Sequence, residues 1–236
     1  MNSNAPKLKP DDYLQTDFLD RVAHELRGPA GVALGALEEL EHSLPAEHAE
    51  TVMALLTMAR RGIRRVLRTA DNLHRAGQLE GQRVEWTRAP SDLHEILRSA
   101  ARDAEALESR RGIRVHIEAA PEPCIVNCDA AWLGTALGEL VMNAIRHAKR
   151  TASVRIVLEP DFVRIVVSDD GRGFSSEPIA RFERPSERRG LGLSIPMVRD
   201  VMRAHAGELS IERSDDPEMP GARVVLSLPK YLAVSP

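Results

Sequence analysis

Two stretches near the N-terminus repeat apolar residues at alternating steps of four and three positions. The first runs from Leu19 to Leu44 and the second from Val52 to Leu73. This alternation is the heptad pattern of helices that pack along one apolar stripe. Between them, Ser43-Leu44-Pro45 ends one helix and allows another to begin. The pattern therefore predicts an antiparallel helical hairpin.

One apolar stripe on each helix cannot enclose a core within a single hairpin. Two hairpins that pair through their stripes bury them in a four-helix bundle. We therefore expect a homodimer through the hairpin. The low aromatic content, 3% of the residues, agrees with this prediction, because a core lined by Ala and Leu has little room for rings.

After Gly81 the pattern changes to short alternating segments of strand and helix. Helical patterns cover residues 91–110, 130–148 and 191–205, and strand patterns cover 83–87, 113–118, 124–126, 153–158, 162–168, 208–212 and 223–228. Mixed strands and helices after an all-helical start predict a second domain of the α+β class, with helices over one face of a sheet. The expected segments are a tail (1–11), the hairpin (12–80), the mixed domain (81–232) and a second tail (233–236).

Composition excludes several classes of protein. With 43% apolar residues among 236, the chain has enough apolar side chains for a core, unlike a disordered chain. Its 32 basic and 35 acidic residues nearly balance, so we expect no electrostatic binding of nucleic acid. The longest stretch without Asp, Glu, Lys or Arg, from Gly28 to Leu37, is too short to span a membrane. Since the start also lacks the apolar core of a signal peptide, we expect a cytoplasmic protein.

The two cysteines, Cys124 and Cys128, lie four residues apart in a short apolar run. This spacing suits half of a metal site, but no second pair accompanies it and the eight histidines are scattered. We expect reduced structural thiols.

His24 is the first candidate for chemistry. It falls one residue past a stripe position and Glu25 two past, so both side chains point away from the stripe toward solvent. Glu25 can act as a base that holds one ring nitrogen while the other attacks. Pro29 cannot donate a hydrogen bond to the carbonyl of Glu25, and three glycines soften the same stretch: Gly28, Gly31 and Gly35. A lone surface histidine is usually without function, but this local weakness indicates that bending beside His24 is useful.

One helix face in the second domain carries groups that suit a metal ion and phosphates: Glu139, Asn143, Arg146 and His147. An amide oxygen suits a hard cation such as Mg²⁺, whereas Arg and His suit phosphate oxygens. By itself this face is a weak indication, because many helices present a similar one.

Two glycine-rich turns provide a further candidate for a ligand-binding site. The strand at residues 163–168 runs into Asp169-Asp170-Gly171-Arg172-Gly173, and Gly190-Leu191-Gly192-Leu193 opens a helix. Glycines let the backbone approach a ligand, and a helix N-terminus favours phosphate, although each pair of glycines also suits an ordinary turn. Asp169 can accept a hydrogen bond from an exocyclic amine such as that of adenine. Walker and Rossmann motifs are absent.

Together these segments resemble the sensor histidine kinases of two-component systems, which have a GHKL-type ATP-binding domain with the α/β-sandwich, or Bergerat, fold. Residues 18–29 resemble the H box, 139–147 the N box, 169–173 the G1 box and 190–193 the G2 box, while 207–209 and 221–229 resemble the closing strands. The resemblance covers residues 12–230 in the family's order. Four ordered boxes are far more specific than any one of them.

The resemblance implies an ATP-dependent protein-histidine kinase. In such a protein, His24 is the phosphoacceptor and Glu25 its acid/base partner. The phosphoryl group then passes to an aspartate on the receiver domain of a response regulator.

For the ATP pocket, the resemblance implies that Asn143 binds Mg²⁺ and that Asp169 reads adenine. Positive charge at Arg146 and His147 holds phosphates and offsets charge in the transferring group. The implied nucleotide site also includes other residues of the three boxes: Glu139, Gly171, Gly173, Gly190, Leu191, Gly192 and Leu193.

The sequence departs from the family at several positions. Gly28 stands where many members have a Thr or Asn that assists dephosphorylation of the regulator, so we expect weak phosphatase activity. Glu139 stands where many have Asn, and its carboxylate can activate water, which predicts modest futile ATP hydrolysis. Arg188 replaces a glycine common before the G2 box, and the F box is recognisable only at residues 180–184.

Two other functions remain open from the sequence. One is a histidine phosphotransferase with a vestigial ATP domain, and the other is a non-enzymatic, nucleotide-sensing dimeric module. The presence of Asn143, Asp169 and the glycines favours the kinase. Because the hairpin and the ATP domain account for nearly the whole length, we expect a separate sensor or regulatory protein to supply the input.

Overall fold

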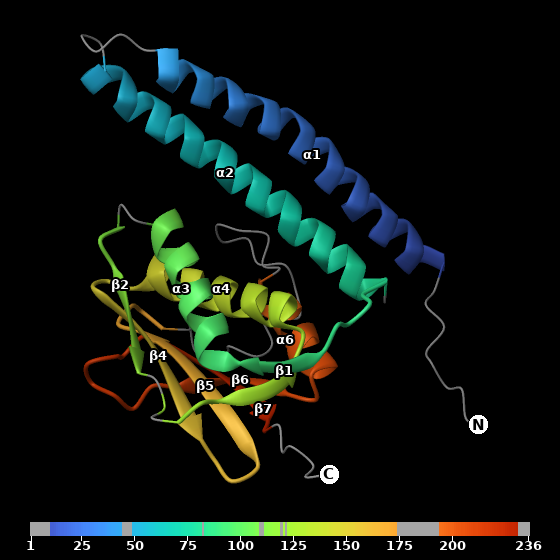
Figure 1. Ribbon diagram of the computed structural model, residues 1–236, viewed down its shortest axis with the longest axis vertical. Helices are drawn as coiled ribbons and strands as arrows, with labels where there is room; N and C mark the ends of the chain where they lie inside the picture. The colour runs from blue at the N-terminus through green and yellow to red at the C-terminus, as the bar shows by residue number, and fades with distance from the viewer. Residues whose placement is uncertain are drawn as a thin grey trace. The chain divides into compact units, whose positions relative to one another are not determined.

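The chain divides into two compact units, Met1–Val84 and Glu85–Pro236. The structure is a computed structural model, and it describes residues 10–43, 49–81, 83–108, 111–118, 120, 122–173 and 194–230. Figure 1 shows a pair of long helices in the first unit and a mixed layer of helices and strands in the second.

The first unit is a hairpin of two helices, α1 (Pro10–Ser43) and α2 (Ala49–Glu80). The prediction of a hairpin is confirmed. Ala23 and Ala70 are fully buried where the helices meet, and Leu56 and Leu73 are buried to more than nine-tenths. The helix α1 continues through Pro29, whose ring leaves one backbone carbonyl of the preceding turn without its helical donor.

Polar pairs between α1 and α2 fix the antiparallel register of the helices. The Nε atom of Arg27 lies 2.8 Å from Oδ1 of Asp71. One helical turn before His24, Asp20 accepts a hydrogen bond of 2.9 Å from Nδ1 of His74. Both pairs lie close in sequence to His24, so the segment that carries it is held to α2 on either side.

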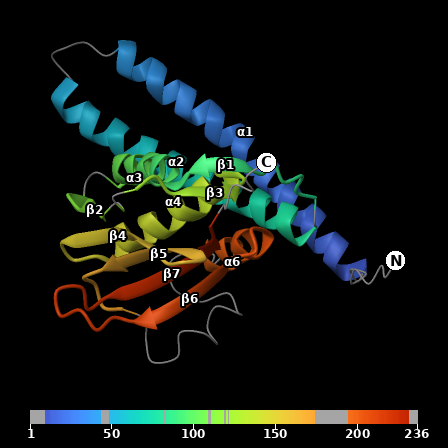
Figure 2. The same ribbon diagram turned by 60° about the horizontal axis from the view of Figure 1, so that its bottom comes forward.

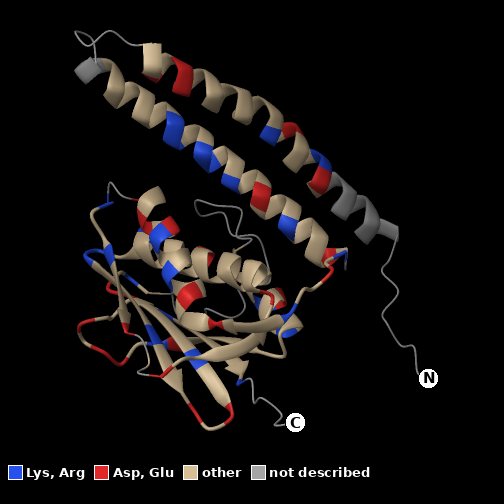
Figure 3. Ribbon diagram, viewed as in Figure 1, with Lys and Arg blue, Asp and Glu red and all other residues tan. Residues whose placement is uncertain are grey.

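Charge is divided unequally between the two helices of the hairpin. In the ribbon of Figure 3, positions of Lys and Arg recur along α2, and acidic positions are more frequent on α1. The ion pair between Arg60 and Glu41 links the two sets. Apart from His74, the basic residues of α2 are all arginines: Arg60, Arg61, Arg64, Arg65, Arg68 and Arg75.

A single hairpin leaves much of its apolar surface in contact with solvent. Large exposed apolar side chains occur on both helices, with exposed fractions from 40% at Val66 to 76% at Val32. Leu55 and Met58 of α2 are exposed to 62% and 57%, and Leu40 of α1 to 51%. The hairpin therefore does not enclose its own core, as one stripe per helix predicts.

The second unit contains a five-stranded sheet and a separate pair of strands. The sheet has the order β2-β4-β5-β7-β6, with β2 parallel to β4 and all other neighbours antiparallel. These strands are β2 (Arg114–Glu118), β4 (Thr151–Leu158), β5 (Phe162–Asp169), β6 (Glu208–Arg213) and β7 (Ala222–Pro229). The separate pair is β1 (Ala89–Asp92), antiparallel to β3 (Ile125–Cys128).

Three helices cover one face of the five-stranded sheet, as Figures 1 and 2 show from two sides. They are α3 (Leu93–Leu107), α4 (Ala130–His147) and α6 (Ser194–Ala204). Fully buried aliphatic side chains fill the layer between helices and sheet, including Leu133, Leu137 and Ile145 from α4 and Ile165 and Leu226 from the sheet. Since apolar burial is the main force that holds such layers together, α4 is firmly seated on β4 and β5.

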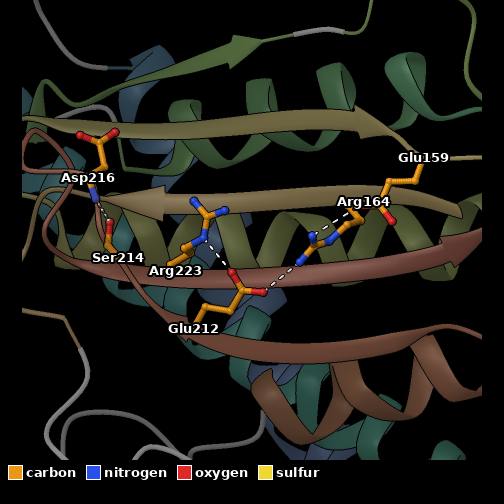
Figure 4. A network of polar contacts seen from close by, with 6 residues as sticks. All are labelled: Glu159, Arg164, Glu212, Ser214, Asp216 and Arg223. Atoms are coloured by element: carbon orange, nitrogen blue, oxygen red, sulfur yellow. Dashed lines mark hydrogen bonds and ion pairs between the residues drawn. The ribbon is translucent and has the colours of Figure 1, made fainter.

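The opposite face of the sheet carries a chain of ion pairs (Figure 4). Glu212 of β6 accepts hydrogen bonds of 2.9 Å from both Arg164 of β5 and Arg223 of β7. Val166 and Val225, which pair in register on the same face, are 6% and 0% exposed. Long arginine side chains that lie along a sheet shield apolar residues in this way. The network ties β5, β6 and β7 together on this face.

Both cysteines are free and buried, in agreement with the prediction of structural thiols. Burial raises the pKa of the Cys124 thiol to about 11 and also raises that of Cys128. Neither thiol is therefore ionised at neutral pH.

One predicted strand is wrong. Residues 83–88 form no strand in the described part of this segment, and the first strand begins at Ala89. The side chain of Trp86 instead packs against Trp132, with ring centroids 5.5 Å apart and ring planes tilted by 50°, and the N–H of Thr87 donates to Asp129 at 2.9 Å. The alternating pattern of this segment thus reflects anchoring to α4 rather than pairing in a sheet. The other predicted elements occur within a few residues of their expected positions.

Candidate functional site

The helix α4 carries four of the predicted site residues, and both of its ends are capped by side chains. Oδ1 of Asp129 accepts hydrogen bonds of 3.1 Å from the N–H groups of Ala131 and Trp132. At the other end, Arg111 donates to the carbonyl of Ala148 at 2.8 Å. These contacts satisfy backbone groups that a helix leaves unpaired, and they place a positive charge at the C-terminus, where the helix dipole favours it.

Glu139 and Asn143 lie one turn apart on α4. Glu139 is only 6% exposed, and its Oε2 accepts a hydrogen bond of 2.6 Å from the hydroxyl of Ser194. Asn143 is half-buried. A half-buried amide oxygen beside a buried carboxylate forms an oxygen-rich site of the kind that a hard cation prefers. No cluster of three or more His, Cys, Asp or Glu side chains suitable for a metal occurs among the described residues.

Asp169 ends β5 and is the most buried acidic side chain among the described residues, with 2% exposed. Its Oδ1 accepts a hydrogen bond of 2.8 Å from the N–H of Gly171, and its carbonyl accepts one of 2.9 Å from Gly221. Burial raises the pKa of Asp169, although hydrogen bonds from Gly171 and Ala222 and the charge of His147 oppose the shift. The carboxylate is thus a fixed hydrogen-bond acceptor in a low-dielectric setting.

Glycine is required on both sides of this carboxylate. A Cβ atom at Gly171 would lie 2.6 Å from Oδ1 of Asp169 and even closer to the carbonyl of His147. A Cβ atom at Gly221 would collide with the same oxygen. Gly173 has a φ of +67°, in the left-handed region that favours glycine. The glycines of the predicted turn therefore let three segments close around Asp169.

Asp170 has a different role from its neighbour. Its side chain accepts hydrogen bonds from the backbone N–H groups of Lys149 and Arg150, the shortest at 2.7 Å. It thereby fastens the segment after α4 to the end of β5, and keeps the C-terminal end of α4 beside Asp169.

Arg146 and His147, predicted to act together on phosphate, point to different surroundings. The Nε atom of Arg146 donates to Oε1 of Glu108 at 2.9 Å, which directs the guanidinium toward the end of α3. His147 is exposed and lies near enough to Asp169 for its charge to lower the pKa of that carboxyl group. His147 therefore lies near the Asp169 carboxylate that is predicted to bind adenine, whereas the Nε of Arg146 is directed toward Glu108.

In the hairpin, His24 and Glu25 are both exposed on α1, next to the fully buried Ala23. Gly28 is also exposed, and a Cβ atom there would meet no other atom within 4 Å. His24 is therefore accessible to a reaction partner, and the position four residues later has room for a larger side chain.

Several predicted site residues lie outside the described residues, namely Gly190, Leu191, Gly192 and Leu193, together with Arg188 and the F-box segment at 180–184. Conversely, the sequence interpretation did not include Ser194 or assign Gly221 a role at Asp169. The one feature of the sequence that points to Ser194 is its position directly after the second glycine-rich turn.

Comparison with known proteins supports the family resemblance. Residues 128–232 match the family described as histidine kinase-, DNA gyrase B-, and HSP90-like ATPase. The sensor histidine kinase CpxA of Escherichia coli is 29% identical over 238 residues, which cover 92% of this chain and 47% of CpxA. The phosphate regulon sensor protein PhoR of Pseudomonas aeruginosa is 27% identical over 211 residues, covering 85% of this chain and 47% of PhoR. The chain thus spans about half the length of these relatives.

Solved structures share the fold. Full-length ShkA in complex with AMPPNP superposes with a TM-score of 0.71 at 22% identity, over 94% of this chain and 47% of ShkA. The mycobacterial sensor histidine kinase MprB superposes with a TM-score of 0.54 at 24% identity, over 61% of this chain and 98% of the solved chain. Among the described residues, no helix is long and apolar enough to cross a membrane.

Proposed function

Because the chain has the catalytic core of a sensor histidine kinase, a helical hairpin followed by a GHKL-type ATPase domain, we propose that it phosphorylates its own His24 from ATP. The proposed hairpin comprises residues 12–80 and the proposed catalytic domain residues 81–232. The observation that carries this proposal is the exposed His24–Glu25 pair on α1 in the same chain as the buried Asp169 carboxylate. Neither feature alone would support phosphoryl transfer, and the proposal rests on the presence of both in one chain.

Asp169 supports adenine binding, because a buried carboxylate at a strand end can accept a hydrogen bond from an exocyclic amine and discriminate against a carbonyl group. The N–H groups that hold the carboxylate keep it oriented before the nucleotide arrives. Gly171 and Gly173 leave the adjoining backbone free of side chains that would occupy the approach to Asp169.

We propose that Mg²⁺ accompanies ATP and that the amide oxygen of Asn143 is its protein ligand. Mg²⁺ usually keeps several waters and binds few protein groups besides phosphates, so the single half-buried amide fits this requirement. When bound, the ion offsets negative charge on the phosphates. Asn143 would orient the ion and the phosphates bound to it. The exposed His147 on the same helix can add positive charge to the site.

In the proposed reaction, a ring nitrogen of His24 attacks the γ-phosphorus, and the bond between this phosphorus and the oxygen of the departing ADP breaks. The new P–N bond leaves a proton on the other ring nitrogen, and Glu25 accepts it. An adjacent carboxylate that orients an imidazole and takes its proton contributes typically 10²- to 10⁴-fold to such reactions.

We further propose that the hairpin forms a homodimer. The exposed apolar side chains of the hairpin, Leu40, Leu55, Met58 and Val66, support pairing with a second copy in a four-helix bundle. Burial of a fully exposed Leu or Met side chain contributes about 1.5–3 kcal/mol, and each of these side chains, 40–62% exposed, would contribute roughly half of that to pairing.

The proposed acceptor of the phosphoryl group is an aspartate on the receiver domain of a response regulator. We also propose weak phosphatase activity. Gly28 has no side chain with which to orient a water molecule against a phosphorylated regulator, and the open space around it offers no substitute.

The test is incubation of the protein with γ-labelled ATP and Mg²⁺. We expect acid-labile, base-stable label that disappears in His24→Ala. His42→Ala is the matched control, because His42 is also an exposed histidine on α1, and this variant should keep the label. Label only after mixing with a phosphorylated receiver would instead support a phosphotransferase, and ATP binding without either label would support a nucleotide-sensing module.

A further inference from the structure

A short hydrogen bond joins the two helices that flank the proposed nucleotide site. The hydroxyl of Ser194, the first residue of α6, donates to Oε2 of Glu139 on α4 at a distance of 2.6 Å. These residues lie 55 positions apart in the sequence. A hydroxyl–carboxylate bond of this length is strong, because the acceptor is charged and little water reaches it.

Glu139 depends on this contact for its orientation. Only 6% of the residue is exposed, and no Lys, Arg or His among the described residues forms a salt bridge with it. A serine at the start of a helix commonly accepts a hydrogen bond from the helix backbone. Here its hydroxyl hydrogen goes to a side chain on another helix, which indicates a role beyond the capping of α6.

We propose that Ser194 is a positioning residue that holds the Glu139 carboxylate in one orientation for the nucleotide reaction. The proposal rests on the proposed function, since it assigns Glu139 to the nucleotide site. Ser194 is the first residue of α6, so the bond couples the start of this helix to α4, the helix that carries Asn143. A reaction that depends on orientation loses rate, rather than affinity, when such a support is removed.

The first experiment separates rate from affinity. Ser194→Ala should lower the rate constant for formation of phosphohistidine by roughly tenfold, as expected for loss of a hydrogen bond to a charged group, while the KM for ATP changes less than about threefold. Ser194→Thr keeps the hydroxyl and should restore the rate to within about twofold. Circular dichroism and thermal unfolding verify that each variant is folded.

The second experiment tests whether Ser194 acts through Glu139. In a Glu139→Ala background the hydroxyl has no carboxylate to hold, so adding Ser194→Ala should change the rate less than about twofold. In a Glu139→Gln background an acceptor oxygen remains, and Ser194→Ala should still lower the rate. An equal loss in all three backgrounds would show that Ser194 merely supports α6 and would overturn the proposal.

A third measurement keeps this proposal distinct from the proposed function. ADP release by His24→Ala reports ATP hydrolysis without a phosphoacceptor, and it should respond to Ser194→Ala and Ser194→Thr as phosphorylation does. If the unaltered protein forms no phosphohistidine but its hydrolysis depends on Ser194 in this way, the kinase proposal fails and the positioning role stands. If Glu139→Ala has no measurable turnover, failure of Ser194→Thr to restore the rate overturns the positioning role.

Discussion

The guanidinium of Arg146 donates from Nε to Oε1 of Glu108 at 2.9 Å, so a side chain at the end of α4 is joined to the end of α3. The side chains are 37% and 21% exposed, which makes this a partly solvated surface pair. The sequence pattern alone assigned Arg146 to phosphate binding. Its position in the structure supports a role between the two helices.

Replacement of Arg146 by Ala should therefore change the affinity for ATP by less than about threefold. The expected loss of stability is below about 1 kcal/mol, because a solvated ion pair contributes little. Equilibrium titration with ATP and urea unfolding measure the two effects. Glu108→Gln is the matched variant and should behave alike, whereas a loss of affinity of tenfold or more in Arg146→Ala alone would support the predicted role of Arg146 in phosphate binding.

Replacement of Asp169 by Asn should weaken ATP binding by at least about tenfold, because the buried acceptor of the adenine amine loses its charge. Its effect on stability should depend on pH. Because burial raises the folded-state pKa, ionisation of Asp169 costs stability as the pH rises from about 3.9 through the folded value. The stability of Asp169→Asn relative to the unaltered protein should therefore increase with pH over this window.

Asp170→Asn is a control in which the change in stability should depend on pH in the opposite direction. Burial acts to raise the pKa of Asp170, but backbone hydrogen bonds from Arg150, Thr151 and Lys149 outweigh it and lower the pKa. Its carboxylate therefore contributes stability that is present above about pH 3.9 and is lost as the pH falls through the folded value. Thermal unfolding between pH 3 and 7 should show opposite trends for the two variants, and parallel trends would contradict the assignment.

His205 predicts a second pH dependence, in a different range. Its Nε2 accepts the N–H of Asp129 at 2.8 Å, and its Nδ1 donates to the carbonyl of Val201 at 2.7 Å. Burial lowers the pKa of His205, so the neutral ring is the form that fits. Since protonation removes the acceptor, stability should be complete above about pH 6.5 and should fall as the pH drops through the folded value.

Tryptophan fluorescence measures this effect, because both tryptophans of the chain, Trp86 and Trp132, lie in this cluster, and the ring centroid of Trp86 is 5.3 Å from that of His205. His205→Gln is neutral at every pH and should lose the dependence between pH 5 and 7. If the stability of this variant kept the same pH dependence, the dependence would belong to another titratable group. His116→Gln, at an exposed position on β2, is the control that should leave it intact.

Gly28 predicts a gain of function. Gly28→Thr or Gly28→Asn should increase the release of phosphate from a phosphorylated response regulator, because the added side chain can orient water and meets no atom within 4 Å at its Cβ. Gly28→Ala separates stability from chemistry. It should stabilise the hairpin by up to about 1 kcal/mol, as expected for Gly to Ala in a helix, without any gain in phosphatase activity. Equal phosphatase rates in the Thr, Asn and Ala variants would contradict this explanation.

The helices and most strands were predictable, because apolar periodicity is a local property that the backbone geometry of each element imposes on its own residues. The hairpin follows from two heptad stripes, and the layered second unit follows from strands and helices of suitable length. The strand predicted at residues 83–87 was wrong because Trp86 alternates with polar neighbours, as in a strand, yet packs on Trp132. Periodicity indicates which side is buried but not against which partner.

The residues of the candidate site also divide into those that the sequence identified and those that it did not. Asp169 and its glycines were identified from the sequence, since a close backbone approach requires glycine and the requirement is local. Asn143 was identified from its motif. The directions of Arg146 and Ser194 were not predictable, because each contacts a residue dozens of positions away, and a helix face does not specify which neighbour it meets.

The sequence by itself therefore determined the two-part organisation, the exposed His24 on its heptad helix and the ordered glycine-rich motifs. Only the tertiary structure decided that Glu139 is held by Ser194, that Arg146 pairs with Glu108 and that glycines close around Asp169. The physical reason is that secondary structure and turns depend on residues within a few positions. The orientation of a long polar side chain depends on which donors and acceptors the packed layers bring within about 3 Å of it.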